Sequence, residues 1–143
     1  MKEAIFAGGC FWHIQKQFDS LSKVYPGIIE TTVGYCGGKV KNPSYKQVCS
    51  GKTDHTESIK IIYKPNEITF EELCVFFMKI HDSTHELKTQ YKSVIFFNSN
   101  YQKRIAERIL SRYKNTKTQL IKFKNNFYNA EKYHQKYHQQ YLL

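Results

Sequence analysis

The sequence lacks a long apolar segment. No run of apolar residues approaches the roughly 18–20 that a membrane-spanning helix requires. The first ten residues hold one lysine and an apolar patch that is too short for the central region of a signal peptide. We therefore expect neither membrane association nor secretion, and a cytoplasmic location.

Cysteine pairs of the Cys-x-x-Cys type are also absent, although single cysteines stand at positions 10, 36, 49 and 74. The six histidines show no zinc-ligand spacing around them. We therefore expect no structural zinc site and no other metal. In a cytoplasmic protein, four such thiols are either buried or active in redox chemistry.

Acidic residues are scarce, since 12 of them face 22 basic residues and leave a formal net charge of +10. A nucleic-acid-binding protein would gather its cations on one helix or stripe. Here the lysines are scattered, and the longest basic stretch, residues 114–124, is interrupted repeatedly. We therefore favour a solvated lysine-rich surface over a nucleic-acid site.

The hydropathy pattern predicts strands interleaved with helices. Short apolar or alternating runs predict strands at 4–7, 28–33, 57–63, 94–97 and 120–123, and helical periodicity predicts helices over 10–25, 69–80 and 101–113. Residues 39–54 and 81–90 are expected as loops, and 133–141 as a polar, aromatic tail with some helical character. This order favours an α+β fold, a mixed sheet of the ferredoxin-like split βαβ kind with helices packed on it.

The chain shows no internal repeat, low-complexity tract or linker. Its 143 residues are 41% hydrophobic, which is enough for a buried core. We therefore expect one domain over residues 1–143, working as a monomer.

Residues 8–12, G-G-C-F-W, place Cys10 at the start of the first predicted helix. Unpaired N–H groups and the helix dipole stabilise a thiolate there, and such cysteines have pKa values down to roughly 3.5–7.5. The two glycines allow another molecule to approach the sulfur. Phe11 and Trp12 either fold into the core or line a pocket, and this segment alone leaves both possibilities open.

Polar groups elsewhere complete the parts of a possible site. Glu57 opens a predicted strand, Asp82 follows a predicted helix, and Tyr45 and Tyr91 lie in predicted loops. Each one alone is explained more simply as a solvated residue. Together with Cys10 they supply a nucleophile, carboxyl groups and phenol donors.

Short motifs follow one another along nearly the whole chain. They are G-C-F-W at 9–12, G-Y-C-G-G at 34–38, N-P-S-Y at 42–45, V-C-S-G at 48–51, D-H-T-E at 54–57, H-D at 81–82, T-Q-Y-K-S at 89–93, F-Y-N-A-E at 127–131 and H-Q-K-Y at 134–137. In type and order they resemble the motifs of the peptide methionine sulfoxide reductase family of the A class.

This resemblance implies an enzyme that reduces methionine (S)-sulfoxide, free or in proteins, to methionine, and so repairs oxidised proteins. Cys10 would attack the sulfoxide sulfur and become a sulfenic acid. Glu57 would protonate the sulfoxide oxygen, and Tyr45 and Tyr91 would donate hydrogen bonds to it. The thiol supplies the electrons, so no cofactor is implied.

The same resemblance assigns the substrate-binding side of the site. Phe11 and Trp12 would form an apolar wall for the methyl group of the sulfoxide, and Asp82 would position the polar side. Two departures from the family bear on this side. His13 stands where glycine is common, and the family's R-Q-G-N-D-x-G stretch is missing between Asp82 and Thr89.

The resolution of the sulfenic acid is the least determined step. Many family members use C-terminal cysteines, and no cysteine follows Cys74 here. Cys36, in a glycine-rich segment, is the first candidate and Cys49 the second, whereas Cys74 is expected to be a packed helix residue. Recycling by thioredoxin is what the resemblance implies.

Two other enzyme classes fit the cysteine less well. A cysteine phosphatase needs an arginine six residues after its nucleophile, and Lys16 occupies that position. A thiol peroxidase also forms a sulfenic acid, but an apolar Phe-Trp wall suits a methyl sulfide better than hydrogen peroxide.

Overall fold

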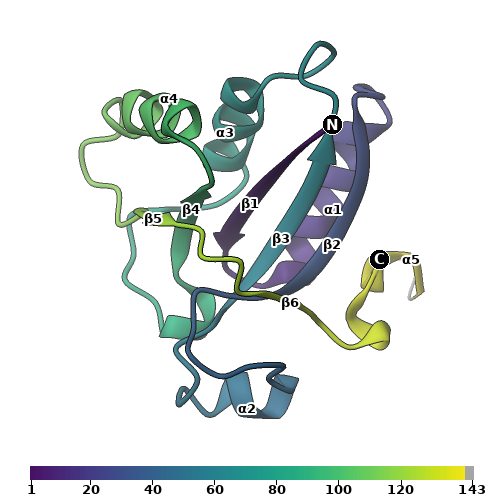
Figure 1. Cartoon of the computed structure of the whole chain (residues 1–143), viewed down its shortest axis with the longest axis vertical. Coiled ribbons are helices and arrows are strands. Elements are labelled where there is room, and N and C mark those ends of the chain that lie inside the picture. Colours follow the sequence, from purple (N-terminus) through teal and green to yellow (C-terminus); the bar gives the residue numbers. More distant parts are fainter. Residues whose placement is uncertain (141–143) are drawn as a thin grey trace.

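The computed structural model describes residues 1–140 and shows an α+β fold (Figure 1). The strands are β1 (Lys2–Gly8), β2 (Ile28–Cys36), β3 (Thr56–Tyr63), β4 (Ser93–Phe97), β5 (Gln119–Lys122) and β6 (Phe127–Asn129). The helices are α1 (Phe11–Ser22), α2 (Tyr45–Cys49), α3 (Phe70–Lys79), α4 (Asn100–Leu110) and α5 (Tyr137–Gln140), with 3-10 turns η1 (Thr89–Tyr91) and η2 (Lys132–His134).

The six strands form one mixed sheet in the order β5-β4-β1-β3-β2-β6. Every neighbouring pair is antiparallel except β4 and β5, which are parallel. The expectation of a mixed sheet with helices packed on it is therefore confirmed. Among residues 1–140, no helix is long and apolar enough to span a bilayer.

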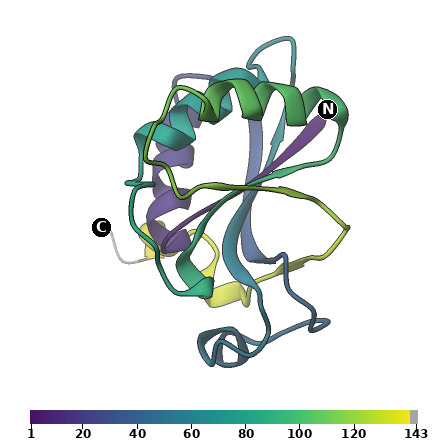
Figure 2. The same ribbon diagram turned by 90° about the vertical axis from the view of Figure 1, so that its left-hand side faces the viewer.

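Alternation along β1 divides the core between the two faces of the sheet. Phe6 points toward the helices and stacks on Phe18 and Phe77 at centroid distances of 5.8 and 4.8 Å. Ile5 and Ala7 point to the opposite face, where they belong to a second apolar cluster. The segment that links β5 to β6 crosses that second face (Figures 1 and 2).

The N-terminal cap of α3 is the one that the sequence predicts. The hydroxyl of Thr69 accepts a hydrogen bond from the Glu72 backbone N–H at 3.0 Å, and the Glu72 carboxylate accepts one from the Thr69 N–H at 3.0 Å. This reciprocal pair satisfies two donors at the start of the helix.

Two segments differ from the sequence-based expectation, while the tail has the helical character that was expected. The predicted loop over 39–54 contains α2, which a Ser44–Gln47 capping box starts. A short strand, β6, pairs with the end of β2 and was not expected. The predicted tail is helical at η2 and α5, while Tyr141, its last residue, lies outside the described residues.

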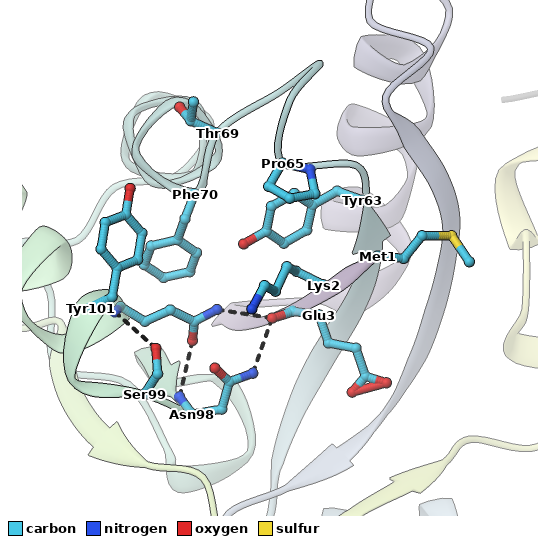
Figure 3. Close-up of a pocket in the computed structure, with 11 residues that line it drawn as sticks. Met1, Lys2, Glu3, Tyr63, Pro65, Thr69, Phe70, Asn98, Ser99 and Tyr101 are labelled. Atoms are coloured by element: carbon cyan, nitrogen blue, oxygen red, sulfur yellow. Dashed lines mark hydrogen bonds between the residues drawn. The ribbon is translucent and has the colours of Figure 1, made fainter.

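A cavity of about 500 Å³ lies at the start of β1 (Figure 3). Met1, Lys2 and Glu3 line it together with Tyr63 and residues at the starts of α3 and α4. Cys10 follows the opposite end of β1, so this cavity is not part of the surroundings of that thiol.

Gly34 on β2 provides a test of the contact that places β6. A Cβ atom at this position would lie 2.3 Å from the Tyr128 carbonyl oxygen and 2.7 Å from the Phe127 ring. We expect Gly34→Ala to lower the free energy of unfolding by about 1–3 kcal/mol, because the backbone of β6 must shift. Urea titration measures this change. Gly51→Asn is the matched control, since Gly51 has a φ of 76° and open space around it.

Candidate active site

Cys10 lies at the junction of β1 and α1, where it is the N-cap residue of the helix with φ −62° and ψ 122°. The backbone N–H groups of Trp12 and His13 reach its sulfur. The residue is exposed, so another molecule can reach it. The sequence therefore predicted the position of this thiol correctly.

The pKa of the thiol moves in the direction opposite to our expectation. Burial of the sulfur raises the pKa of Cys10 above 9.0, and the nearby charge of Glu57 raises it further. Hydrogen bonds from the two backbone N–H groups lower the pKa, but their effect is smaller than the combined effect of burial and Glu57. Its surroundings therefore favour the protonated thiol over the thiolate.

Glu57 is the second residue of β3 and is only 2% exposed. Its Oε1 accepts a hydrogen bond from the Phe11 N–H at 3.2 Å, and its Oε2 accepts one from Gln90 Nε2 at 2.7 Å. Burial raises the pKa of Glu57 above 4.5, although both hydrogen bonds oppose this shift. The carboxyl group thus keeps its proton to a higher pH than an exposed glutamate.

Gln90 links Glu57 to a second thiol. Besides its bond to Glu57, Gln90 Nε2 donates to Cys49 Sγ at 3.2 Å. Gln90 is 7% exposed and lies in η1, whereas Cys49 ends α2 and is exposed. Sequence reasoning gave Gln90 no role, although it lies inside the T-Q-Y-K-S motif.

Tyr45 and Tyr91 come together beside the same groups. A hydrogen bond joins their hydroxyl groups, and Tyr45 also contacts Cys49. Burial raises the pKa of both phenols, and the nearby charge of Glu57 adds to the shift. Both side chains therefore remain protonated and able to donate hydrogen bonds.

The two aromatic residues after Cys10 have different surroundings. Phe11 is 1% exposed and packs in the core, so it offers almost no free surface to a ligand. Trp12 is partly exposed, and its Nε1 donates to His134 Nδ1 at 2.9 Å. The Tyr137 ring stacks on the indole of Trp12 at 3.6 Å with an interplanar angle of 1°. Both tail residues belong to the H-Q-K-Y motif, which was the only signal of their involvement.

Asp82 is not brought to this cluster. Its carboxylate accepts hydrogen bonds from the Thr84 N–H at 2.9 Å and the Thr84 hydroxyl at 2.6 Å, and it pairs with His85 at 3.1 Å on the surface. Within residues 1–140, no hydrogen bond or ion pair joins it to Cys10 or Glu57. Asp82 is exposed, and its described hydrogen bonds and ion pair are all with the segment that follows it.

Cys36 is the last residue of β2 and is fully buried. Its side chain packs with Ile5 and Ala7 on the face of the sheet opposite the helices, and its thiol contacts Asn126 Oδ1 at 4.0 Å. Burial raises its pKa to about 12. Cys74 is likewise buried, on α3.

Metal ligation has no candidate in the part of the chain that the structure describes. Among residues 1–140, no three or more histidine, cysteine, aspartate or glutamate side chains are grouped so that they could hold an ion.

The burial of Glu57 predicts a pH-dependent stability. A carboxyl group whose pKa is higher in the folded than in the unfolded state stabilises the fold at low pH, and this contribution is lost as the pH rises through the folded pKa. We therefore expect Glu57→Gln to gain stability relative to the wild type between pH 4 and pH 8. Thermal melts across this range measure the difference. Glu67→Gln removes an exposed carboxylate and should show no such trend.

The family model described as "Peptide methionine sulfoxide reductase" matches residues 2–142. The MsrA protein of Sulfolobus acidocaldarius is 39% identical to this chain. The alignment covers 94% of this chain and 80% of that relative. That of Pelagibacter ubique is also 39% identical, with 96% of this chain and 97% of the relative covered.

Solved structures show the same relationship. Reduced Mxr1 from Saccharomyces cerevisiae superimposes with a TM-score of 0.86 at 34% identity, covering 97% of this chain and 84% of that one. Methionine sulfoxide reductase A of Corynebacterium diphtheriae gives a TM-score of 0.78 at 28% identity, covering 99% and 76%. Mxr1 in complex with Trx2 gives a TM-score of 0.67 at 27% identity, covering 91% and 81%. With these matches and the cysteine–glutamate cluster described above, the chain belongs to the peptide methionine sulfoxide reductase family.

Proposed function

We propose that this protein reduces methionine (S)-sulfoxide, free or within proteins, to methionine, and that Cys10 is the nucleophile. The observation that carries the proposal is the buried Glu57 carboxyl group, whose oxygen accepts the N–H of Phe11, the residue after the reactive cysteine. A carboxyl group whose pKa is raised by burial is thus held beside a thiol that incoming molecules can reach.

Two proton movements and one oxygen transfer make up the reductive step. Glu57 donates its proton to the sulfoxide oxygen, and the carboxylate that remains accepts the proton of the Cys10 thiol. The Cys10 sulfur attacks the substrate sulfur and forms a transient S–S bond. The protonated oxygen then moves from the substrate sulfur to Cys10, so that the S–O bond and the S–S bond both break and Cys10 becomes a sulfenic acid. The substrate gains two electrons and leaves as the sulfide, and no cofactor takes part.

Phenol groups and an indole bind the two sides of the substrate. Tyr45 and Tyr91, both held in the protonated form, donate hydrogen bonds to the sulfoxide oxygen. Trp12 forms the apolar wall for the methyl group, and Phe11 supports it from the core. Asp82 is left out of this set, because its carboxylate is engaged on the surface.

We propose Cys49 rather than Cys36 as the resolving thiol. Cys49 is exposed and shares the amide of Gln90 with Glu57, whereas Cys36 is buried on the other face of the sheet. The Cys49 sulfur attacks the Cys10 sulfur, a disulfide forms as the S–O bond of the sulfenic acid breaks, and the hydroxyl group takes the proton of the Cys49 thiol and leaves as water. Bridging requires the two Cα atoms to come within about 7 Å, so the exposed end of α2 would move toward Cys10 in this step.

Thioredoxin then reduces the disulfide and returns both thiols. The structure of the yeast relative Mxr1 in complex with Trx2 supports a thioredoxin as the reducing partner. We place the reaction in the cytoplasm, where reducing conditions keep thiols such as these four unpaired.

The proposal also includes the type of fold and the extent of the catalytic domain. The order β4-β1-β3-β2 of the central strands, with antiparallel neighbours, supports assignment to the ferredoxin-like split βαβ folds. We propose that residues 1–143 act as a single catalytic domain and as a monomer.

An assay with the separate sulfoxide epimers and a dithiol reductant tests the activity. We expect the S epimer to be consumed and the R epimer to be spared, because the wall lies on one side of Cys10. Glu57→Gln should slow the single-turnover reduction by roughly 10²–10⁴-fold, as expected for the loss of a positioned acid. Equal use of both epimers, or a wild-type rate in the variant, would contradict the proposal.

Matched cysteine variants test the resolving thiol. Cys49→Ser should complete one turnover, retain the sulfenic acid on Cys10 and lose recycling by thioredoxin, while small thiols still regenerate it. Cys36→Ser should behave as the wild type, because its thiol lies in the core. Mass mapping after one turnover identifies the bridge, and a disulfide between Cys10 and Cys36 would overturn the assignment.

A further inference from the structure

A cluster of polar side chains on α1 and β2 binds the C-terminal segment at one buried carboxylate. Asp19, 9% exposed, accepts hydrogen bonds from Lys136 Nζ at 2.9 Å on both oxygens. His138 Nε2 lies 2.9 Å from Asp19 Oδ2, and the Thr31 hydroxyl donates to Oδ1 at 2.6 Å. We call Asp19, Lys136 and His138 the tail clamp.

The backbone at Lys136 shows that the clamp constrains the chain. Lys136 has a φ of 53°, in the left-handed region that costs a residue with a side chain about 1–2 kcal/mol. Its N–H donates to Gln15 Oε1 at 2.8 Å, and Gln15 is completely buried. Contacts on both the backbone and the side chain of Lys136 therefore hold the tail in this sharp turn.

The turn brings Tyr137 onto the wall of the active site. Tyr137 lies between the two tail members of the clamp, and its ring stacks on Trp12 at 3.6 Å. Trp12, Gln15 and Asp19 follow the i, i+3, i+7 spacing on one face of α1. The tail contacts this face through the hydrogen bond of the Lys136 N–H to Gln15 and the contact of His138 with Asp19.

We propose that Asp19 is a positioning residue for methionine sulfoxide binding. By binding Lys136 and His138, the neighbours of Tyr137, it holds the Tyr137 ring flat against Trp12 and fixes the apolar wall. This role rests on the proposed function, since it assigns Trp12 to the methyl group of the substrate. Asp19 itself does not touch the substrate.

The position of the wall affects substrate binding more than the chemical step. The wall contacts the methyl group equally before and during oxygen transfer, so its displacement removes uniform binding. We expect Asp19→Asn and Lys136→Met each to raise the KM for methionine (S)-sulfoxide by roughly 3- to 30-fold, with little change in kcat. A change of this size corresponds to the loss of one or two apolar contacts.

Trp12 also provides a readout that does not depend on activity, because it is the only tryptophan in the chain. In the folded wild type, the stacked Tyr137 ring shields the indole. Acrylamide quenching of Trp12 fluorescence should therefore increase in Asp19→Asn and in Lys136→Met. Glu67→Gln, which breaks an exposed ion pair with Lys64, is the matched control and should change neither quenching nor KM.

The two measurements, fluorescence quenching and KM, test the role of the tail clamp and the proposed function separately. Increased quenching together with a raised KM supports the proposal, and a folded Asp19→Asn with wild-type quenching and KM overturns it. If Asp19→Asn does not fold, Lys136→Met decides by the same two measurements. An inactive wild type that shows increased quenching in the variants would contradict the proposed function while leaving the structural coupling intact.

Discussion

The site depends on one buried carboxyl group. Glu57 sits at the start of β3 with 2% exposure, and its two oxygens bind the first N–H of α1 and the amide of Gln90. These bonds connect three segments that are far apart in sequence, and Gln90 extends the connection to Cys49 on α2. A carboxylate in this place is costly unless it is hydrogen-bonded or protonated, so the same burial that organises the segments also prepares an acid.

The apolar side of the site has a separate support. Two residues of the tail contact Trp12: His134 accepts a hydrogen bond from its indole N–H, and the Tyr137 ring stacks on the indole. Burial lowers the pKa of His134, so the imidazole stays neutral and its Nδ1 remains an acceptor for the indole. Glu131 ties the same tail to α2 by accepting the Tyr45 N–H at 2.8 Å. The tail thus touches both the wall and the helix that carries the phenol and Cys49, although it contributes no reacting atom.

Sequence reasoning predicted the positions of Cys10 and Glu57 in the fold better than it described their surroundings. The positions of Cys10 and Glu57 follow from strand ends and a helix start, which local patterns reveal. The pKa of Cys10 was expected too low, because the helix-dipole argument leaves out the loss of water around the sulfur.

Cys36 was preferred because glycines flank it, but the face toward which a strand residue points depends on register, which only the pairing of β2 with its neighbours defines. Gln90 and Asp19 were missed, since their partners are separated from them by 33 and more than 100 residues, respectively.

The raised pKa values of Cys10 and Glu57 together define how the resting site holds its protons. Each group in its charged form would disfavour ionisation of the other, since a carboxylate and a thiolate repel. Both shifts therefore favour the neutral pair over the charged one. In the proposed reaction, a sulfoxide oxygen that accepts the Glu57 proton would create the carboxylate that takes the thiol proton, so substrate binding itself would produce the thiolate. In this scheme no proton has to come from solvent, and raising the pKa of the thiol also reduces its reaction with unselective oxidants, which attack the thiolate.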